Sequence, residues 1–182
     1  MENRQGLARY FWQVTAAHTI AYFVAGLFAM RFLDYAALWE TGHFAFMRPL
    51  DSPAIGLGPG LQLFRGALYA LVLLPLRRQL FEEKYGLAKF GLLLFGLTYL
   101  LTFAAAPGSF EGFIFTTIPL RYQLMGIPEM LLWIALFLVA LHVQIKYGHK
   151  KIVTILSIFF VALIVLMSVA GFASLSGLAP FA

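Results

Sequence analysis

Long apolar runs, separated by short polar stretches or by stretches rich in glycine and proline, dominate this chain. Each run approaches the roughly 20 residues that an α-helix needs to cross a bilayer. A transmembrane β-barrel would instead show segments of about 10 residues with alternating polarity. The pattern predicts an all-α integral membrane protein, one transmembrane domain over residues 1–182. Its five transmembrane helices are expected at 11–33, 59–80, 87–106, 128–147 and 152–173.

Prolines refine these boundaries. Pro59 and Pro128 suit the first position of a helix, where the missing N–H costs nothing. Pro75 lies inside the second predicted span and should kink its last turn. The first run follows two arginines as a signal peptide would, but its length and the lack of a small-x-small cleavage site predict a retained helix.

Composition supports lipid as the main solvent. Of the 182 residues, 62% are hydrophobic and only 12% charged, whereas soluble domains have about 45–50% apolar and about 25% charged residues. The mean hydropathy is +0.85. The chain has no cysteine, which excludes disulfides, thiolate metal sites and a cysteine nucleophile.

The net charge of +5 indicates orientation rather than nucleic-acid binding, because the basic residues stand at span ends. One side is expected to hold Arg4, Arg9, Arg77, Arg78, Lys84, Lys89, Lys146, Lys150 and Lys151. The other is expected to hold Arg31, Arg48 and Arg121, with Arg65 inside a span. This bias predicts a cytoplasmic N-terminus and an external C-terminus, and it fits a bacterial cytoplasmic (inner) membrane.

The two connections expected outside, 34–58 and 107–127, are long and apolar, and we expect them to pack against each other. The segment Phe44–Leu50 (FAFMRPL) parallels Phe113–Leu120 (FIFTTIPL), with one extra residue in the second copy. The similarity suggests two parallel helical hairpin repeats followed by a fifth helix. Internal repeats of this kind occur in transporters.

Arg65 and Glu129 are the strongest candidates for a functional site, since charges inside a membrane are costly and need partners. Counted from Pro59, Arg65 lies six residues, or about 9 Å, inside the outer end of its helix. Glu129 stands in the first turn of the fourth span, at the same end. The two heads are therefore expected to meet, either in a ligand-binding cavity or as a salt bridge that only joins the hairpins.

Further polar residues belong to the outer connections. Glu111, Arg121 and His43 are included as possible ligand-binding residues. Asp34, Glu40, Arg48 and Asp51 accompany them. None has the spacing of a known metal site, so no metal is assigned, and a solvated loop surface is the favoured explanation for them.

His18 and His142 are expected at similar depth on different helices, which is the arrangement that a bis-histidine b-type haem requires. Histidines capped within a bundle are the alternative. A stripe of small residues on the first helix should allow close helix packing. The stripe consists of Ala17, Ala21, Ala25 and Ala29.

The fifth span carries no charge, and it is expected to face lipid or to contact another protomer through Ser168, Ala170, Gly171 and Ser174. The favoured function is binding or passage of a small anionic ligand or ion near Arg65, in an oligomer. A structural subunit of a larger membrane complex is the alternative. An intramembrane lipid-modifying enzyme, with Glu129, Glu111 or His43 as base, is a third hypothesis, and no catalytic residue is assigned.

Overall fold

The computed structural model describes residues 4–178, which form helices joined by turns and irregular segments. The long helices are α1 (Arg4–Phe32), α3 (Pro53–Leu73), α8 (Ile127–Tyr147) and α9 (Lys151–Leu175). The shorter ones are α2 (Tyr35–Trp39), η1 (Gly42–Phe44), η2 (Leu74–Leu76), α4 (Arg77–Phe81), α5 (Gly86–Phe95), η3 (Gly96–Leu100), α6 (Phe110–Phe115) and α7 (Leu120–Met125).

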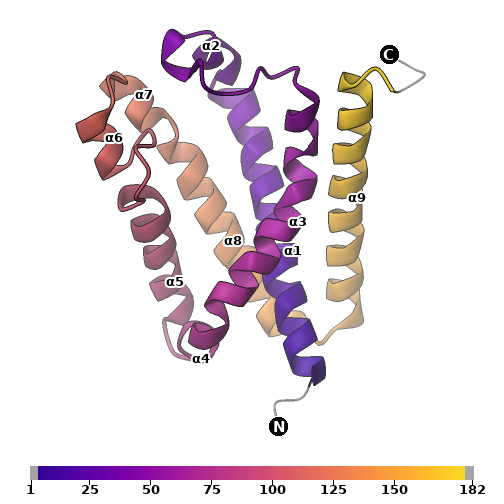
Figure 1. Cartoon of the computed structure of the whole chain (residues 1–182). Coiled ribbons are helices and arrows are strands. Elements are labelled where there is room, and N and C mark those ends of the chain that lie inside the picture. Colours follow the sequence, from indigo (N-terminus) through magenta and orange to yellow (C-terminus); the bar gives the residue numbers. More distant parts are fainter. Residues whose placement is uncertain (1–3, 179–182) are drawn as a thin grey trace.

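Helix α1 is the centre of the bundle. It packs against α3 and α8, while α9 covers α3 and α5 lies against α8 (Figure 1). Helices α2, α6 and α7 lie at the end of the bundle opposite the start of α1, and we call this the outer end. Helix α1 begins at one end of the bundle and α9 finishes at the other (Figure 1).

Four helical segments in the described part of the chain are long and apolar enough to cross a membrane. They are Gly6–Phe32, Pro53–Phe81, Leu120–Tyr147 and Lys151–Leu175. The third predicted span, 87–106, corresponds to the shorter apolar helix Gly86–Leu100. The residue before a proline disfavours the helical conformation, and Ala106 precedes Pro107. The helical segment ends earlier still, at Leu100. The count of five spans and their orientation therefore stay predictions.

The start of the second helix was predicted wrongly. Helix α3 begins at Pro53, which occupies the first turn, and Pro59 lies inside the helix. Proline removes one backbone donor and crowds the preceding turn, so an interior proline needs compensation. The expected break at Pro75 is confirmed, because α3 gives way there to the 3-10 turn η2.

Ser168 of α9 binds the glycine-rich turn of α3 that contains Pro59. Its hydroxyl accepts from the Gly60 N–H at 3.0 Å and donates to the Gly56 carbonyl at 2.6 Å. These are the two groups that a regular α-helix would pair with each other. A Cβ on Gly56 would lie 2.7 Å from the Phe172 nitrogen, so the backbones of α3 and α9 are in direct contact.

This contact changes the interpretation of the fifth span. Ser168 and Gly171, expected at a contact between protomers, pack instead against α3 of the same chain. The other faces of α9 expose large apolar side chains such as Ile155, Phe159 and Leu166. An oligomer or membrane-complex partner through α9 stays a prediction, and it would have to use those faces.

The small-residue stripe on α1 is confirmed as a packing device. Ala17, Ala21, Ala25 and Ala29 are each at most 1% exposed. On the facing helix, a Cβ added to Gly66 would lie 2.9 Å from the Cα of Thr15. Helices α1 and α3 therefore approach each other as closely as small residues allow.

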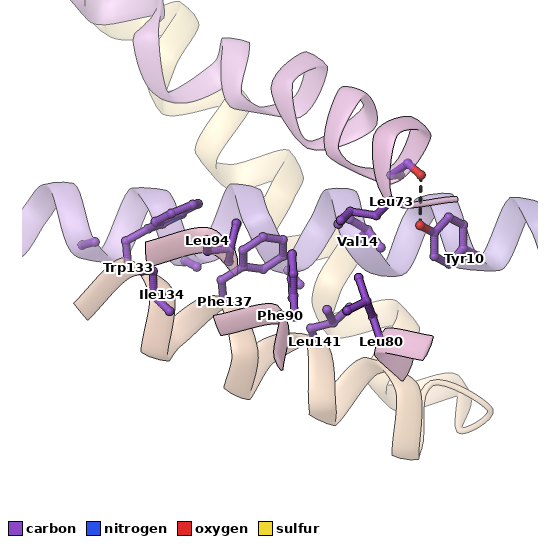
Figure 2. Packing of buried hydrophobic residues seen from close by; sticks show 14 residues of the cluster. Tyr10, Val14, Leu73, Leu80, Phe90, Leu94, Trp133, Ile134, Phe137 and Leu141 are labelled. Carbon is purple, nitrogen blue, oxygen red and sulfur yellow. Dashed lines mark hydrogen bonds between the residues drawn. The ribbon is translucent and has the colours of Figure 1, made fainter. Parts of the chain in front are cut away.

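Figure 2 shows how α8 joins this core: Trp133, Ile134, Phe137 and Leu141 project from one face of α8. Phe90 of α5 meets Phe137 at 5.5 Å between ring centroids, in an edge-on arrangement. Phe137 is fully buried. The bundle is therefore filled by aromatic packing at its middle.

Candidate functional site

A cavity of about 180 Å³ lies among α1, α3, η3 and α8, and we call it the polar chamber. Its lining residues come from all four elements: Tyr22, Ala25, Arg65, Thr98, Gly126, Glu129, Met130 and Trp133. The part contributed by η3 is a π-helical turn, in which the Leu101 N–H donates to the Gly96 carbonyl. Such turns are rare and often occur at functional sites.

Arg65 and Glu129 both line this chamber, as their predicted proximity requires. Because α3 starts at Pro53, Arg65 lies twelve residues in, or about 18 Å along the axis. Glu129 lies nine residues beyond Leu120 in the segment formed by α7 and α8, or about 14 Å. Arg65 thus lies twice as many residues into its helix as the count from Pro59 indicated.

The two charges share the chamber without forming an ion pair in the described part of the chain. The Arg65 guanidinium carbon lies 5.8 Å from the centroid of the Tyr69 ring, a cation–π contact. Its side chain is otherwise exposed in the isolated chain. The structure therefore places a cation at a cavity where no carboxylate among residues 4–178 is bonded to it.

Glu129 is bound by Tyr35 instead. The Tyr35 hydroxyl, from α2 in the first outer connection, donates to Glu129 Oε2. Burial raises the pKa of Tyr35 above its ordinary value, and the bond to the carboxylate adds to the rise, so Tyr35 keeps its proton as a donor. Sequence reasoning missed Tyr35, because its position follows from how α2 folds back over the bundle.

Trp133 and the residues packed behind it form the aromatic floor of the polar chamber, on the side toward the middle of the bundle, and this floor contains buried polar atoms. Trp133 meets the fully buried His18 edge-on at 5.7 Å between ring centroids. His18 Nε2 lies 3.2 Å from Gln62 Oε1, and Gln62 Nε2 donates to the Gly58 carbonyl, so His18 Nε2 carries the proton. Within the described residues, His18 Nδ1 and Trp133 Nε1 are buried without a hydrogen-bond partner. One is an acceptor and the other a donor.

A second cavity, of about 440 Å³, lies between the two outer connections, and we call it the apolar chamber. It is lined by Tyr35, Leu38, Trp39, Phe44, Phe46, Met47, Ala104, Ala105, Ala106, Pro107, Tyr122, Met125 and Gly126. Phe44 of the first connection contacts Tyr122 of the second at 6.1 Å between ring centroids. The expected packing of the outer connections against each other is confirmed.

The remaining predicted site residues lie outside the polar chamber. The His43 ring lies 5.8 Å from the Tyr122 ring between centroids in a tilted arrangement, and the Arg121 guanidinium donates to the Tyr122 hydroxyl at 2.7 Å. Glu111 stands in the first turn of α6. His43 and Arg121 thus converge on Tyr122, at the wall of the apolar chamber. Within residues 4–178, no three His, Asp or Glu side chains gather as a metal site needs.

Gln123, which sequence reasoning overlooked, organises the second connection. It is 2% exposed, accepts from the Gly108 N–H at 2.7 Å, and donates to the Gly112 carbonyl and to Thr116 Oγ1 at 3.0 and 2.9 Å. Ser109 caps α6 by accepting from the Gly112 N–H. The only signal in the sequence was an uncharged polar residue inside an apolar loop.

The structure does not bring His18 and His142 together. His18 is enclosed by aromatic rings and bonded to Gln62, whereas His142 is on the exposed side of α8, next to the buried Leu141. Phe137 and Leu141 are four residues apart and lie on the buried face of α8. His142 follows Leu141 directly and therefore lies on a different face. This arrangement does not fit a bis-histidine haem.

Comparisons with protein-family models, with curated proteins and with solved structures found no significant match to this chain. The fold and composition define a multi-pass α-helical membrane protein. The function has to be argued from the two chambers themselves.

Proposed function

We propose that this protein binds a small molecule carrying an anionic group, a carboxylate or a phosphate, with that group held by Arg65 in the polar chamber. The observation that carries the proposal is that the Arg65 guanidinium borders a cavity and is bonded to no carboxylate among residues 4–178. Guanidinium is the side chain best suited to grip such groups with two parallel hydrogen bonds.

The cost of burying charge supports this proposal. An arginine at this depth of a membrane protein is expensive, and such residues are normally paired or face a water-filled cavity. Glu129 does not complete the pair, because its carboxylate accepts from Tyr35. An arriving anion would supply the missing partner, which makes binding favourable.

The aromatic floor favours binding over passage. Below Trp133 lie His18 and Phe137, both fully buried. A separate cavity of about 230 Å³ near Arg9 and His149 lies at the opposite end of the bundle. The packed layer between the two cavities would have to open for a ligand to cross. A receptor-like or carrier-like binding site is therefore the function that the geometry supports best.

The test is calorimetric titration of the purified protein in lipid nanodiscs with butyrate and with butyl phosphate, using butanol as the uncharged control. We expect at least one anion to bind and butanol not to bind. Arg65→Gln should lower the affinity about 10- to 100-fold, since hydrogen bonds to charged groups contribute about 1.5–3 kcal/mol.

Arg48→Gln is the matched control, because Arg48 is exposed in the first outer connection and does not line the polar chamber. It should leave the affinity unchanged. A folded Arg65→Gln protein with wild-type affinity would refute the proposal. If Arg65→Gln unfolds, Arg65→Lys takes its place: a folded Arg65→Lys protein should bind the anions more weakly than the wild type, and wild-type affinity would refute the proposal.

A further inference from the structure

We infer that the ligand is a single-chain amphiphile whose hydrocarbon part occupies the apolar chamber while its anionic head occupies the polar chamber. This inference rests on the proposed function and assigns a ligand class to it. Its basis is that two cavities with different linings adjoin each other: one has a charged lining residue of each sign, and the other is lined mainly by aromatic and aliphatic side chains.

Two residues show that the chambers adjoin. Gly126 lines both cavities. Tyr35 lines the apolar chamber, and its hydroxyl binds Glu129, which lines the polar chamber. The Tyr35–Glu129 hydrogen bond and the Gly126 backbone are thus the partition between the two cavities.

Gly126 is not required by the fold at this point. Its φ of −78° is ordinary for any residue. A Cβ there would meet only the Tyr99 hydroxyl, at 4.0 Å, so neither backbone strain nor close packing demands a glycine. What the glycine does provide is open space at the junction, which a ligand that extends through both chambers needs.

The sizes and surroundings of the chambers fit an amphiphile. The apolar chamber, at about 440 Å³, falls within the range of small-molecule pockets. Its rim includes the 72% exposed Phe46, and the nearby Phe103 is 98% exposed, so an apolar chain meets apolar surface on the way in. Arg121, held on Tyr122, adds a cation beside the entrance.

Charge complementarity selects the head group. Arg65 lies in the polar chamber, beyond the partition. In the apolar chamber, the Tyr35 hydroxyl already donates to Glu129, and the Trp39 N–H already donates to the Arg48 carbonyl. Among the residues that line the two chambers, only Arg65 offers a cation to an anionic head. The apolar chain is left in the chamber above.

The test is a chain-length series of straight-chain carboxylates from butyrate to dodecanoate, titrated into protein-loaded nanodiscs with empty nanodiscs as the reference for partitioning. Wild-type affinity should rise up to about fourfold for each added methylene until the apolar chamber is full, and then level off. Gly126→Leu should lose the gain with chain length, measured relative to the affinity of the same variant for butyrate.

Gly58→Leu is the control, because a side chain at Gly58 would also meet open space but lies away from both chambers. It should keep the full chain-length gain. If Gly126→Leu does not fold, Ala105→Trp, which fills the apolar chamber from the other wall, takes its place with the same expected loss.

The outcomes separate this inference from the proposed function. Butyrate binding that depends on Arg65 but does not strengthen with chain length overturns the amphiphile and leaves the proposed function standing. Retention of the chain-length gain in both Gly126→Leu and Ala105→Trp also overturns it. Butyrate and dodecanoate affinities that are both unaffected by Arg65→Gln overturn the two proposals together.

Discussion

Ser168→Ala removes the hydroxyl that binds the proline-containing turn of α3. Ser168 is 4% exposed, and its Oγ makes two hydrogen bonds, 3.0 Å from the Gly60 nitrogen and 2.6 Å to the Gly56 carbonyl. Gly60 directly follows Pro59 and Gly56 lies three residues before it, in the turn where Pro59 supplies no backbone donor. We expect the variant to fold with a weaker α3–α9 contact.

The magnitude follows from the environment. Side-chain hydrogen bonds between transmembrane helices contribute about 0.6 kcal/mol on average and up to about 1.7. Two bonds lost give about 1–3 kcal/mol. Part of this loss is recovered if the Gly60 N–H and the Gly56 carbonyl then pair with each other, so we expect a destabilisation of about 1–2 kcal/mol. That range is a factor of about 5–30 in the unfolding equilibrium.

The assay is reversible unfolding of the purified protein in mixed micelles with increasing SDS, followed by circular dichroism. Ser174→Ala on the same helix is the matched control, because Ser174 is exposed; its effect should stay within about 0.5 kcal/mol. If Ser168→Ala and Ser174→Ala unfold at the same SDS fraction, the hydroxyl bridge does not stabilise α3 and the reasoning is refuted.

Two further predictions concern packing and the outer end. Gly66→Ala should destabilise the protein by about 1–3 kcal/mol in the same assay, because its Cβ would lie 2.9 Å from the Thr15 Cα. The control Gly58→Ala places its Cβ in open space and should be neutral or stabilising. Equal effects of the two substitutions would contradict the close approach of α1 and α3. Gln123→Ala should lower the stability by about 2–4 kcal/mol, because it leaves buried backbone groups unpaired. Proteolysis should then cleave the second outer connection faster. Thr117→Ala, at an exposed position, should change neither measurement.

The sequence predicted helices best where apolar runs are uninterrupted. Helices α8 and α9 begin and end within two residues of the predicted spans, because glycine, proline or lysine marks their ends. The start of α3 was missed because Pro59 was placed at the first position of the helix. In this bundle Gly56 and Gly60, on either side of Pro59, are where α9 packs against the helix, and that contact is not encoded locally.

Part of the candidate site could be predicted and part could not. Arg65 and Glu129 were expected at the same end of two spans, and both line the polar chamber, although the depth of Arg65 was counted from the wrong helix start. Tyr35, Gly126 and Trp133 could not be recognised in this way, because their roles arise from how separate segments converge on the two chambers. Periodicity along one helix carries no information on such convergence.

The central position of α1 has a consequence for biosynthesis. Helix α1 is the least apolar of the four long segments, with a mean hydropathy of 1.3 against 3.0 for α9, yet half of its most apolar window is buried, against 22% in α9. It also contains Thr15, His18 and Thr19, all buried. Helix α9 suits lipid on its own, whereas α1 is suited to protein. Because α1 precedes α3 in the chain, we expect α1 to stay near the insertion machinery until α3 supplies Gln62 as the partner of His18.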